Sequence, residues 1–110
     1  MARLRNVPRD EPQFLAELIT PKKNQIVSMA LSQSDHFHVS LFTFADRETV
    51  SEEEYFGDTL YYVLEGETLI HLKDREVLVK AGQVFSVPAH TLHAIGGKEA
   101  FKVLQITVNE

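Results

Sequence analysis

Hydrophobic and polar residues alternate along the chain from Gln25 onward with a period of two, which is the pattern of β-strands. β-branched and aromatic residues dominate the alternating runs, and turn-forming pairs such as Glu65-Gly66 and Ala81-Gly82 separate them. The runs cover residues 27–31, 37–41, 60–64, 68–72, 76–80, 84–87, 92–95 and 101–108. The pattern therefore predicts seven or eight short strands.

The connections between these runs indicate the fold class. Parallel strands need long crossover connections, usually helices, and no stretch between the runs has the length or spacing of one. We therefore predict an all-β fold in which antiparallel strands form a jelly-roll barrel. Within residues 60–64, Tyr61 and Val63 alternate with Tyr62 and Leu64, so we expect this strand to be buried on both faces.

One segment near the N-terminus has the period of a helix instead. Apolar residues recur four apart between residues 14 and 19, Asp10 stands where an N-cap is expected, and Pro12 suits a first turn. Thr20-Pro21 then ends the pattern. We predict that residues 1–24 form an arm with a short helix or helical turn and that residues 25–110 form the barrel.

Composition and charge exclude several classes of function. The 110 residues have room for one domain, and the absence of cysteine removes disulfides, thiolate metal sites and a cysteine nucleophile. A net charge of -5 disfavours nucleic acid as a partner. No apolar run approaches the ~20 residues of a membrane span, and no hydrophobic stretch follows the basic N-terminus as in a signal peptide. We expect a cytoplasmic protein that binds neither nucleic acid nor membrane.

Two segments resemble the conserved motifs of the cupin superfamily, over roughly residues 41–108. Residues 61–67 resemble the central strand and turn, and residues 82–93 resemble the second motif. That motif runs Gly, five residues, Pro-x-Gly, two residues, His, three residues, Asn. Gly82, Pro88 and His93 fit it, whereas His90 replaces the second Gly and Gly97 replaces the Asn. The resemblance implies a double-stranded β-helix, and it says little about function because one fold carries many chemistries.

The first cupin motif, which supplies most metal ligands in metal-binding members, has changed here. It runs Gly, five residues, His-x-His, three or four residues, Glu, six residues, Gly. Counted back from Gly66 with the three-residue spacing, its positions hold Arg47, Glu53, Tyr55 and Thr59. The four-residue spacing places Glu52 and Glu54 at the two histidine positions. Both counts lose the two histidines and the ligand carboxylate, so His93 alone remains.

The altered set still contains oxygen donors and one imidazole. We take His93, Glu53 and Asp58 as candidate ligands of a divalent metal such as iron, manganese, nickel or zinc, held more weakly than by the complete motif. The alternative is that residues 52–54 form a solvated acidic face and that His93 is a core histidine. For a ligand pocket the candidates are His93, Tyr55, Thr59, Tyr61 and His71.

The remaining histidines carry weaker signals. His36 and His38 lie two apart, a spacing that would place both on one strand face and that metal sites on β-scaffolds use. We favour an ordinary polar pair, because the spacing is a loose signal. His71 either enters the barrel or faces solvent, and His90 lies in the turn after Pro88, either at the barrel mouth or on the surface.

Three functions are compatible with these residues, and none assigns a catalytic residue. The favoured one is a barrel that binds a small molecule, because it requires no residue that the sequence lacks. The second is a metal-dependent enzyme of the dioxygenase or isomerase kind with the altered ligand set, His71 included. The third is a metal-free acid–base enzyme, as in sugar epimerases that share this fold, with His93 paired to Tyr55 or Tyr61.

We also expect self-association. A barrel of this length has a limited core, and open sheet edges favour pairing with a second copy. Small cupins commonly form dimers, and the apolar residues 60–64 and 101–108 suit such an interface. The sequence therefore predicts a homodimer.

Overall fold

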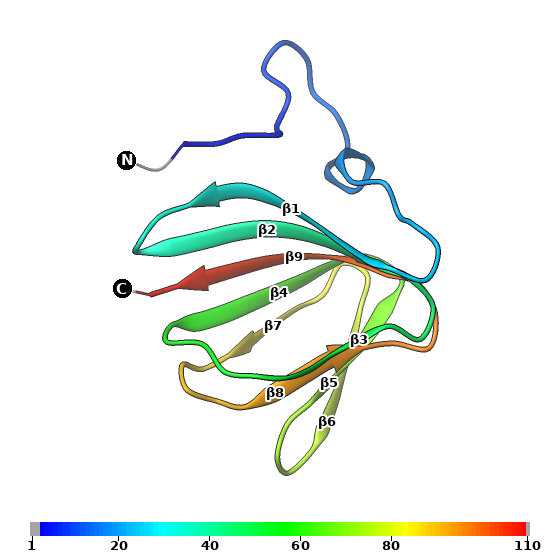
Figure 1. Cartoon of the computed structure of the whole chain (residues 1–110), viewed down its shortest axis with the longest axis vertical. Coiled ribbons are helices and arrows are strands. Elements are labelled where there is room, and N and C mark those ends of the chain that lie inside the picture. Colours follow the sequence, from blue (N-terminus) through cyan, green and yellow to red (C-terminus); the bar gives the residue numbers. More distant parts are fainter. Residues whose placement is uncertain (1–2, 110) are drawn as a thin grey trace.

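A computed structural model describes residues 3–109 and confirms the all-β antiparallel fold (Figure 1). The described chain contains one 3-10 turn, η1 (Leu15–Leu18), and nine strands. The strands are β1 (Ile26–Gln33), β2 (Phe37–Phe44), β3 (Thr49–Glu53), β4 (Asp58–Glu65), β5 (Glu67–His71), β6 (Glu76–Lys80), β7 (Val84–Val87), β8 (His93–Gly96) and β9 (Phe101–Val108). Within this range, no helix has the length and apolar character needed to cross a membrane.

The strands form two sheets that face each other (Figure 1). One sheet has the order β1-β2-β9-β4-β7 and the other β3-β8-β5-β6, with antiparallel pairing throughout. Their inner faces enclose the main hydrophobic core, in which the rings of Phe44 and Phe101 stack with centroids 4.4 Å apart. The fold is therefore a two-layered barrel with its core between the sheets.

The inner face of the larger sheet changes from apolar to polar along the barrel. Cross-strand pairing sets its side chains in rows, beginning with the Phe44–Phe101 pair at the end where β9 begins. The next rows are Phe42, Val103 and Val63, then Ser40, Gln105 and Tyr61, and finally His38, Thr107 and Thr59. The polar rows lie at the end where β9 finishes, so this end is the mouth and any site inside the barrel opens there.

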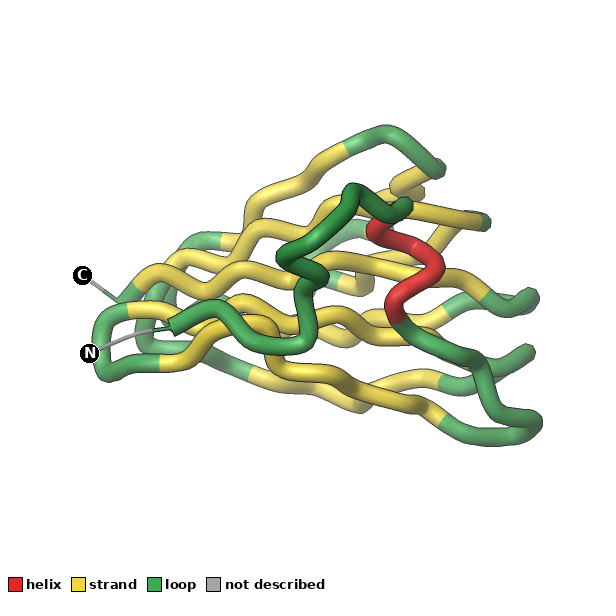
Figure 2. The backbone as a smooth tube through the Cα atoms, turned by 90° about the horizontal axis from the view of Figure 1, so that it is seen from above, coloured by secondary structure: helices red, strands yellow, loops and turns green. Residues whose placement is uncertain are grey.

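The N-terminal arm lies across the outer face of the larger sheet (Figure 2). Ile19 is buried there against Leu31 and Leu41, and the Lys102 ammonium donates a 2.6 Å hydrogen bond to the Ala16 carbonyl. The arm contains a helical turn, the short 3-10 turn η1, within the segment that has helical spacing, and no side chain caps it. Because a first helical turn is costly and gains few hydrogen bonds, packing of apolar side chains on the sheet determines the conformation of this segment.

Burial of β4 on both faces was expected, and the outer face departs from this. On the inner face Tyr61 and Val63 are fully buried, whereas Tyr62 on the outer face remains 36% exposed. Leu64 packs against the cluster beneath the arm. The arm covers only part of the outer face, so some apolar side chains on the outer face of this strand remain exposed in the monomer.

Strand β3 was not expected from the sequence, because it has a single apolar residue, Val50, among polar neighbours. It forms by pairing with β8, in which Val50 lies opposite Ile95 and Glu53 opposite His93. Gly96 is required at this junction, since a Cβ there would lie 2.2 Å from the Thr49 methyl group. The pairing brings residues of the altered first motif next to the second motif.

Candidate functional site

A cavity of about 190 Å³ lies between the sheets, beneath the mouth of the barrel. Four of the residues proposed from the sequence line it, namely Glu53, Tyr55, Tyr61 and His93. The other lining residues are Phe42, Phe44, Val50, Ile95, Val103 and Gln105. The cavity is thus apolar on most sides, with its polar groups on β3, β4, β8, β9 and the segment after β3. We call it the inner cavity.

His93 and Tyr61 form a buried hydrogen-bonded pair in the wall of the inner cavity. The Tyr61 hydroxyl lies 2.7 Å from His93 Nε2, and Tyr61 and His93 are 1% and 2% exposed, respectively. On the other side of the ring, Nδ1 lies 2.8 Å from the Thr91 carbonyl, which can only accept. Nδ1 therefore carries a hydrogen, so in the neutral ring Nε2 accepts and the Tyr61 hydroxyl donates.

The protonation of Tyr61 agrees with this assignment. Burial raises the pKa of the Tyr61 phenol far above its ordinary value, and the neighbouring Tyr55 and Glu53 side chains raise it further. Tyr61 thus stays a hydroxyl at neutral pH and keeps a proton to donate. Its oxygen retains lone pairs that can accept from a molecule in the cavity.

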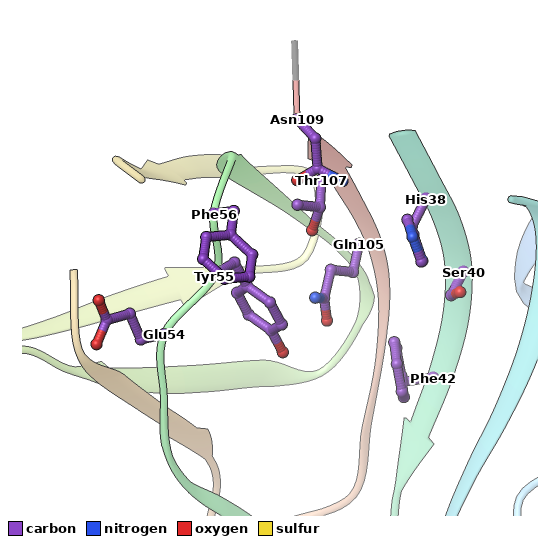
Figure 3. Close-up of a pocket in the computed structure, with 9 residues that line it drawn as sticks. All are labelled: His38, Ser40, Phe42, Glu54, Tyr55, Phe56, Gln105, Thr107 and Asn109. Atoms are coloured by element: carbon purple, nitrogen blue, oxygen red, sulfur yellow. The ribbon is translucent and has the colours of Figure 1, made fainter. Parts of the chain in front are cut away.

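Tyr55 and Glu53 complete the polar side of the inner cavity. The Tyr55 ring lies with its centroid 6.0 Å from that of His93, and Glu53 is the cross-strand partner of His93. These are the two residues that the three-residue spacing assigns to the motif's histidine positions. The four-residue spacing assigns Glu52 and Glu54 instead, and neither lines the inner cavity. Glu54 extends away from it (Figure 3), and its carboxylate lies 3.6 Å from His90 Nδ1. The structure thus supports the three-residue count.

The segment that carries Tyr55 is held in place from two sides. The His90 amide donates a 2.8 Å hydrogen bond to the Tyr55 carbonyl, and the Ala89 amide donates one of the same length to Asp58 Oδ1. Gly57 passes so close to β9 that a Cβ would lie 2.0 Å from the Val108 carbonyl oxygen. These contacts fix Tyr55 and the exposed Phe56 beside the mouth.

A second cavity of about 410 Å³ continues from the inner one to the mouth (Figure 3). It shares Phe42, Tyr55 and Gln105 with the inner cavity. Its other lining residues are His38, Ser40, Glu54, Phe56, Thr107 and Asn109. We call it the outer cavity. The two cavities adjoin at the residues that they share, and we refer to both together as the channel.

Three of the proposed residues lie outside the inner cavity. Asp58 is exposed at the start of β4, where its carboxylate accepts from the Ala89 amide. The hydroxyl of Thr59 is buried 3.0 Å from that of Thr107, so the two satisfy each other. His71 ends β5 as an exposed residue, 2.8 Å from the Glu76 carboxylate. The fold therefore does not bring these three residues to His93.

The other histidines lie apart from His93 and from one another. His36 lies in the turn before β2, whereas His38 lies on β2 and lines the outer cavity. His90 is at the rim, edge-on to Phe56 with ring centroids 5.7 Å apart. Gln105, Phe42 and Ser40 line the channel although no motif marked them. The period of two placed Ser40 and Phe42 on one face, but nothing in the sequence marked that face as the inner one.

The donor set does not fit the metal that the cupin resemblance implies. Within residues 3–109 no three His, Asp or Glu side chains are grouped closely enough to hold a metal ion. His93 uses both ring nitrogens in hydrogen bonds, and the carboxylate of Asp58 is bonded to the Ala89 amide. Glu53 and His93 alone leave too few nitrogen and carboxylate donors for a first-row divalent ion.

Comparison with known proteins relates the whole chain to one family. A family model described as "Cupin domain" matches residues 41–107. A cupin superfamily protein from Desulfitobacterium hafniense DCB-2 is 54% identical, with a TM-score of 0.95 over 98% of this chain and 99% of that one. A cupin 2 conserved barrel domain protein from Leptotrichia buccalis is 30% identical, with a TM-score of 0.83 over 86% of this chain and 46% of that one.

A conserved protein of unknown function from Streptococcus pyogenes has the same fold at lower identity. It is 23% identical, with a TM-score of 0.94 over 100% of this chain and 96% of that one. No curated protein matches the sequence significantly. The comparisons therefore establish the family and the fold, and the activity has to be argued from the channel itself.

Proposed function

Since the chain belongs to the cupin superfamily, we propose that its function lies inside the barrel and consists of binding a small organic molecule there. The observation that carries the proposal is the buried Tyr61–His93 pair, which faces a cavity rather than packed side chains. Burying two polar side chains is costly unless they are bonded, and these two satisfy each other while still facing open space. A core that served stability alone would fill this space.

The channel has the properties of a small-molecule site. Binding sites are mostly apolar, with a few polar groups that orient the ligand, and the outer cavity of about 410 Å³ falls in their usual size range. The inner cavity of about 190 Å³ is somewhat larger than the ~150 Å³ cavity that accepts benzene in another protein. We infer that one ring-sized group enters the inner cavity and that the rest of the ligand occupies the outer one.

The polar groups of the channel suggest how a ligand is oriented. The Tyr61 hydroxyl donates to His93, so its oxygen is free to accept a hydrogen bond from a ligand N–H or O–H. Gln105 lines both cavities and offers an amide that donates and accepts. A ligand with an apolar ring in the inner cavity and a polar group attached to that ring could form hydrogen bonds with both Tyr61 and Gln105.

A fragment screen followed by amide NMR tests the proposal. Bound fragments are expected to shift amide resonances of β3, β8 and β9, and Ser40→Phe should abolish these shifts because it fills the outer cavity. Ser86→Phe is the matched control, since Ser86 is exposed on β7 and outside both cavities. Fragments that bind equally well to both variants would show that the channel is not the binding site.

A metal-free acid–base enzyme is the second candidate. It is favoured by one specific observation, the 2.7 Å contact of Tyr61 with His93 Nε2 while the Thr91 carbonyl fixes the tautomer. A hydroxyl bonded to an oriented imidazole can pass a proton to or from a bound molecule. If this candidate is correct, a bound ligand is converted by the wild type and only bound by His93→Ala; a ligand recovered unchanged from the wild type argues for binding alone.

The metal-dependent alternative makes a separate demand. It needs about one metal per chain, held by His93 and Glu53 with help from residues that lie elsewhere. Elemental mass spectrometry of the untagged protein and of His93→Ala tests it. We expect metal well below one per chain in both, because the donors do not converge within residues 3–109; stoichiometric metal that disappears in the variant would restore this alternative.

A further inference from the structure

We propose that the ligand of this channel is an organic cation, an amine attached to a ring-sized apolar group, and that Glu53 selects it. This rests on the proposed function, because it assigns a charge class to the molecule that the barrel binds. Three features of the channel carry the inference: a carboxylate without a partner among residues 3–109, aromatic faces beside it, and the sign of the charges along the walls.

The first feature is the position of Glu53. It lies opposite His93 across the β3–β8 pair and therefore shares the inner face of the sheet. Glu53 lines the inner cavity and is also exposed to solvent, and its negative charge is one of the causes that raise the pKa of Tyr61. Among residues 3–109 no basic side chain forms an ion pair with it. A carboxylate at a cavity wall without a counter-charge attracts a cation from the ligand side.

The second feature is the aromatic lining next to Glu53. The rings of Phe42 and Tyr55 line both cavities, and Phe56 stands at the mouth (Figure 3). Aromatic faces attract ammonium groups through the ring quadrupole, and this attraction grows where water is excluded. A cation bound in the channel would therefore have aromatic side chains near it as well as Glu53.

The third feature is the sign of the charges along the channel. The described lining residues of the two cavities include Glu53 and Glu54 and contain neither lysine nor arginine. Recognition of phosphate or carboxylate groups normally relies on those two residue types. An anionic ligand would enter the field of Glu53 without compensation, whereas an amine would neutralise it.

Three fragments with one ring and different charges test the inference. At neutral pH benzylamine is a cation, benzyl alcohol is neutral and benzoate is an anion, and all three match the size of the inner cavity. Their affinities are measured by amide NMR titration of the full chain, Glu53→Gln and Glu52→Gln. Glu52→Gln is the matched control, because it removes the same charge from an exposed neighbour outside both cavities.

We expect the wild type and Glu52→Gln to bind benzylamine roughly tenfold more tightly than benzoate, since the partly exposed carboxylate attracts one ligand and repels the other. In Glu53→Gln the difference should fall below about twofold. Equal affinities in the wild type, or a preference that persists in Glu53→Gln, would overturn the inference. Binding of benzyl alcohol without any charge preference would do so while sparing the proposed function, and no binding of any fragment would count against both.

Discussion

Tyr61 and His93 form a buried hydrogen-bonded pair inside the barrel. Each is buried, and each supplies the hydrogen-bond partner that the other lacks. Two consequences follow, one for the stability of the protein and one for its dependence on pH.

Tyr61→Phe should destabilise the protein by about 1–3 kcal/mol, because it leaves Nε2 of the buried His93 without a partner. The matched control is Tyr62→Phe, which removes the same hydroxyl from the neighbouring residue, 36% exposed on the outer face. We expect the control to change the free energy of unfolding by less than about 0.5 kcal/mol. Urea denaturation measures both; equal effects would mean that the hydroxyl of Tyr61 does not stabilise the fold.

The raised pKa of Tyr61 predicts a loss of stability in alkali. Above pH ~10 the unfolded chain releases the tyrosine proton while the folded chain keeps it, so folding becomes less favourable as the pH rises. Below that pH the contribution is fully present. Denaturation measured at increasing pH should show a slope that approaches about 1.4 kcal/mol per pH unit from this residue and is absent in Tyr61→Phe. Parallel profiles of the two proteins would contradict the assignment.

At the level of elements, two turns have left-handed backbone at positions where the cupin motifs have glycine. Arg47 and His90 occupy glycine positions of the two motifs, and their φ angles are +66° and +60°. In this left-handed region a side chain costs about 1–2 kcal/mol relative to glycine. Both turns therefore have a backbone conformation that glycine would adopt at lower cost.

His90→Gly should be more stable than His90→Ala by about 1 kcal/mol. Both variants remove the imidazole from Phe56 and Glu54, and only glycine relieves the left-handed backbone. The comparison thus isolates the conformation of the turn from the contacts of the side chain. Thermal unfolding of the two variants measures the difference, and an alanine variant as stable as the glycine variant would refute backbone strain at this turn.

At the scale of the whole molecule, the outer face of the larger sheet exposes a group of apolar side chains. Beyond the reach of the arm it exposes Leu60, Tyr62, Val84 and Val108, between 36% and 56% each. These residues belong to the adjacent strands β4, β7 and β9. Exposed apolar groups that adjoin one another are typical of an interaction surface.

We predict that a second copy of the chain covers this face and that the protein is a dimer at micromolar concentration. Val84→Lys combined with Tyr62→Lys should shift light-scattering masses toward the monomer, because charge would be buried in the interface. Leu78→Lys is the control, since Leu78 is 45% exposed on β6 in the other sheet. A monomeric wild type would exclude this surface as a dimer interface.

Part of the candidate site could be predicted from the sequence, because residues at the motif positions lie close together in the folded barrel. Counting back from Gly66 with the three-residue spacing, one of the two spacings considered, placed Glu53 and Tyr55 at the motif's histidine positions, and both line the inner cavity with His93. Asp58 was selected because it stands beside a motif position, and His71 because it lies on a strand; the fold places Asp58 next to the Ala89 amide and His71 in an exposed contact with Glu76. Adjacency in sequence, or a polar side chain on a strand, does not specify which side of a sheet the side chain occupies.

The sequence by itself determined the described strands other than β3, because a period of two is a local property of the chain. Only the tertiary structure decided which face of each strand lies inside. On β2 the apolar residues Val39 and Leu41 lie on the outer face near the N-terminal arm, while Ser40 and Phe42 line the channel. Alternation specifies which side chains share a face, whereas the segment that packs against that face is chosen by contacts between residues far apart in the chain.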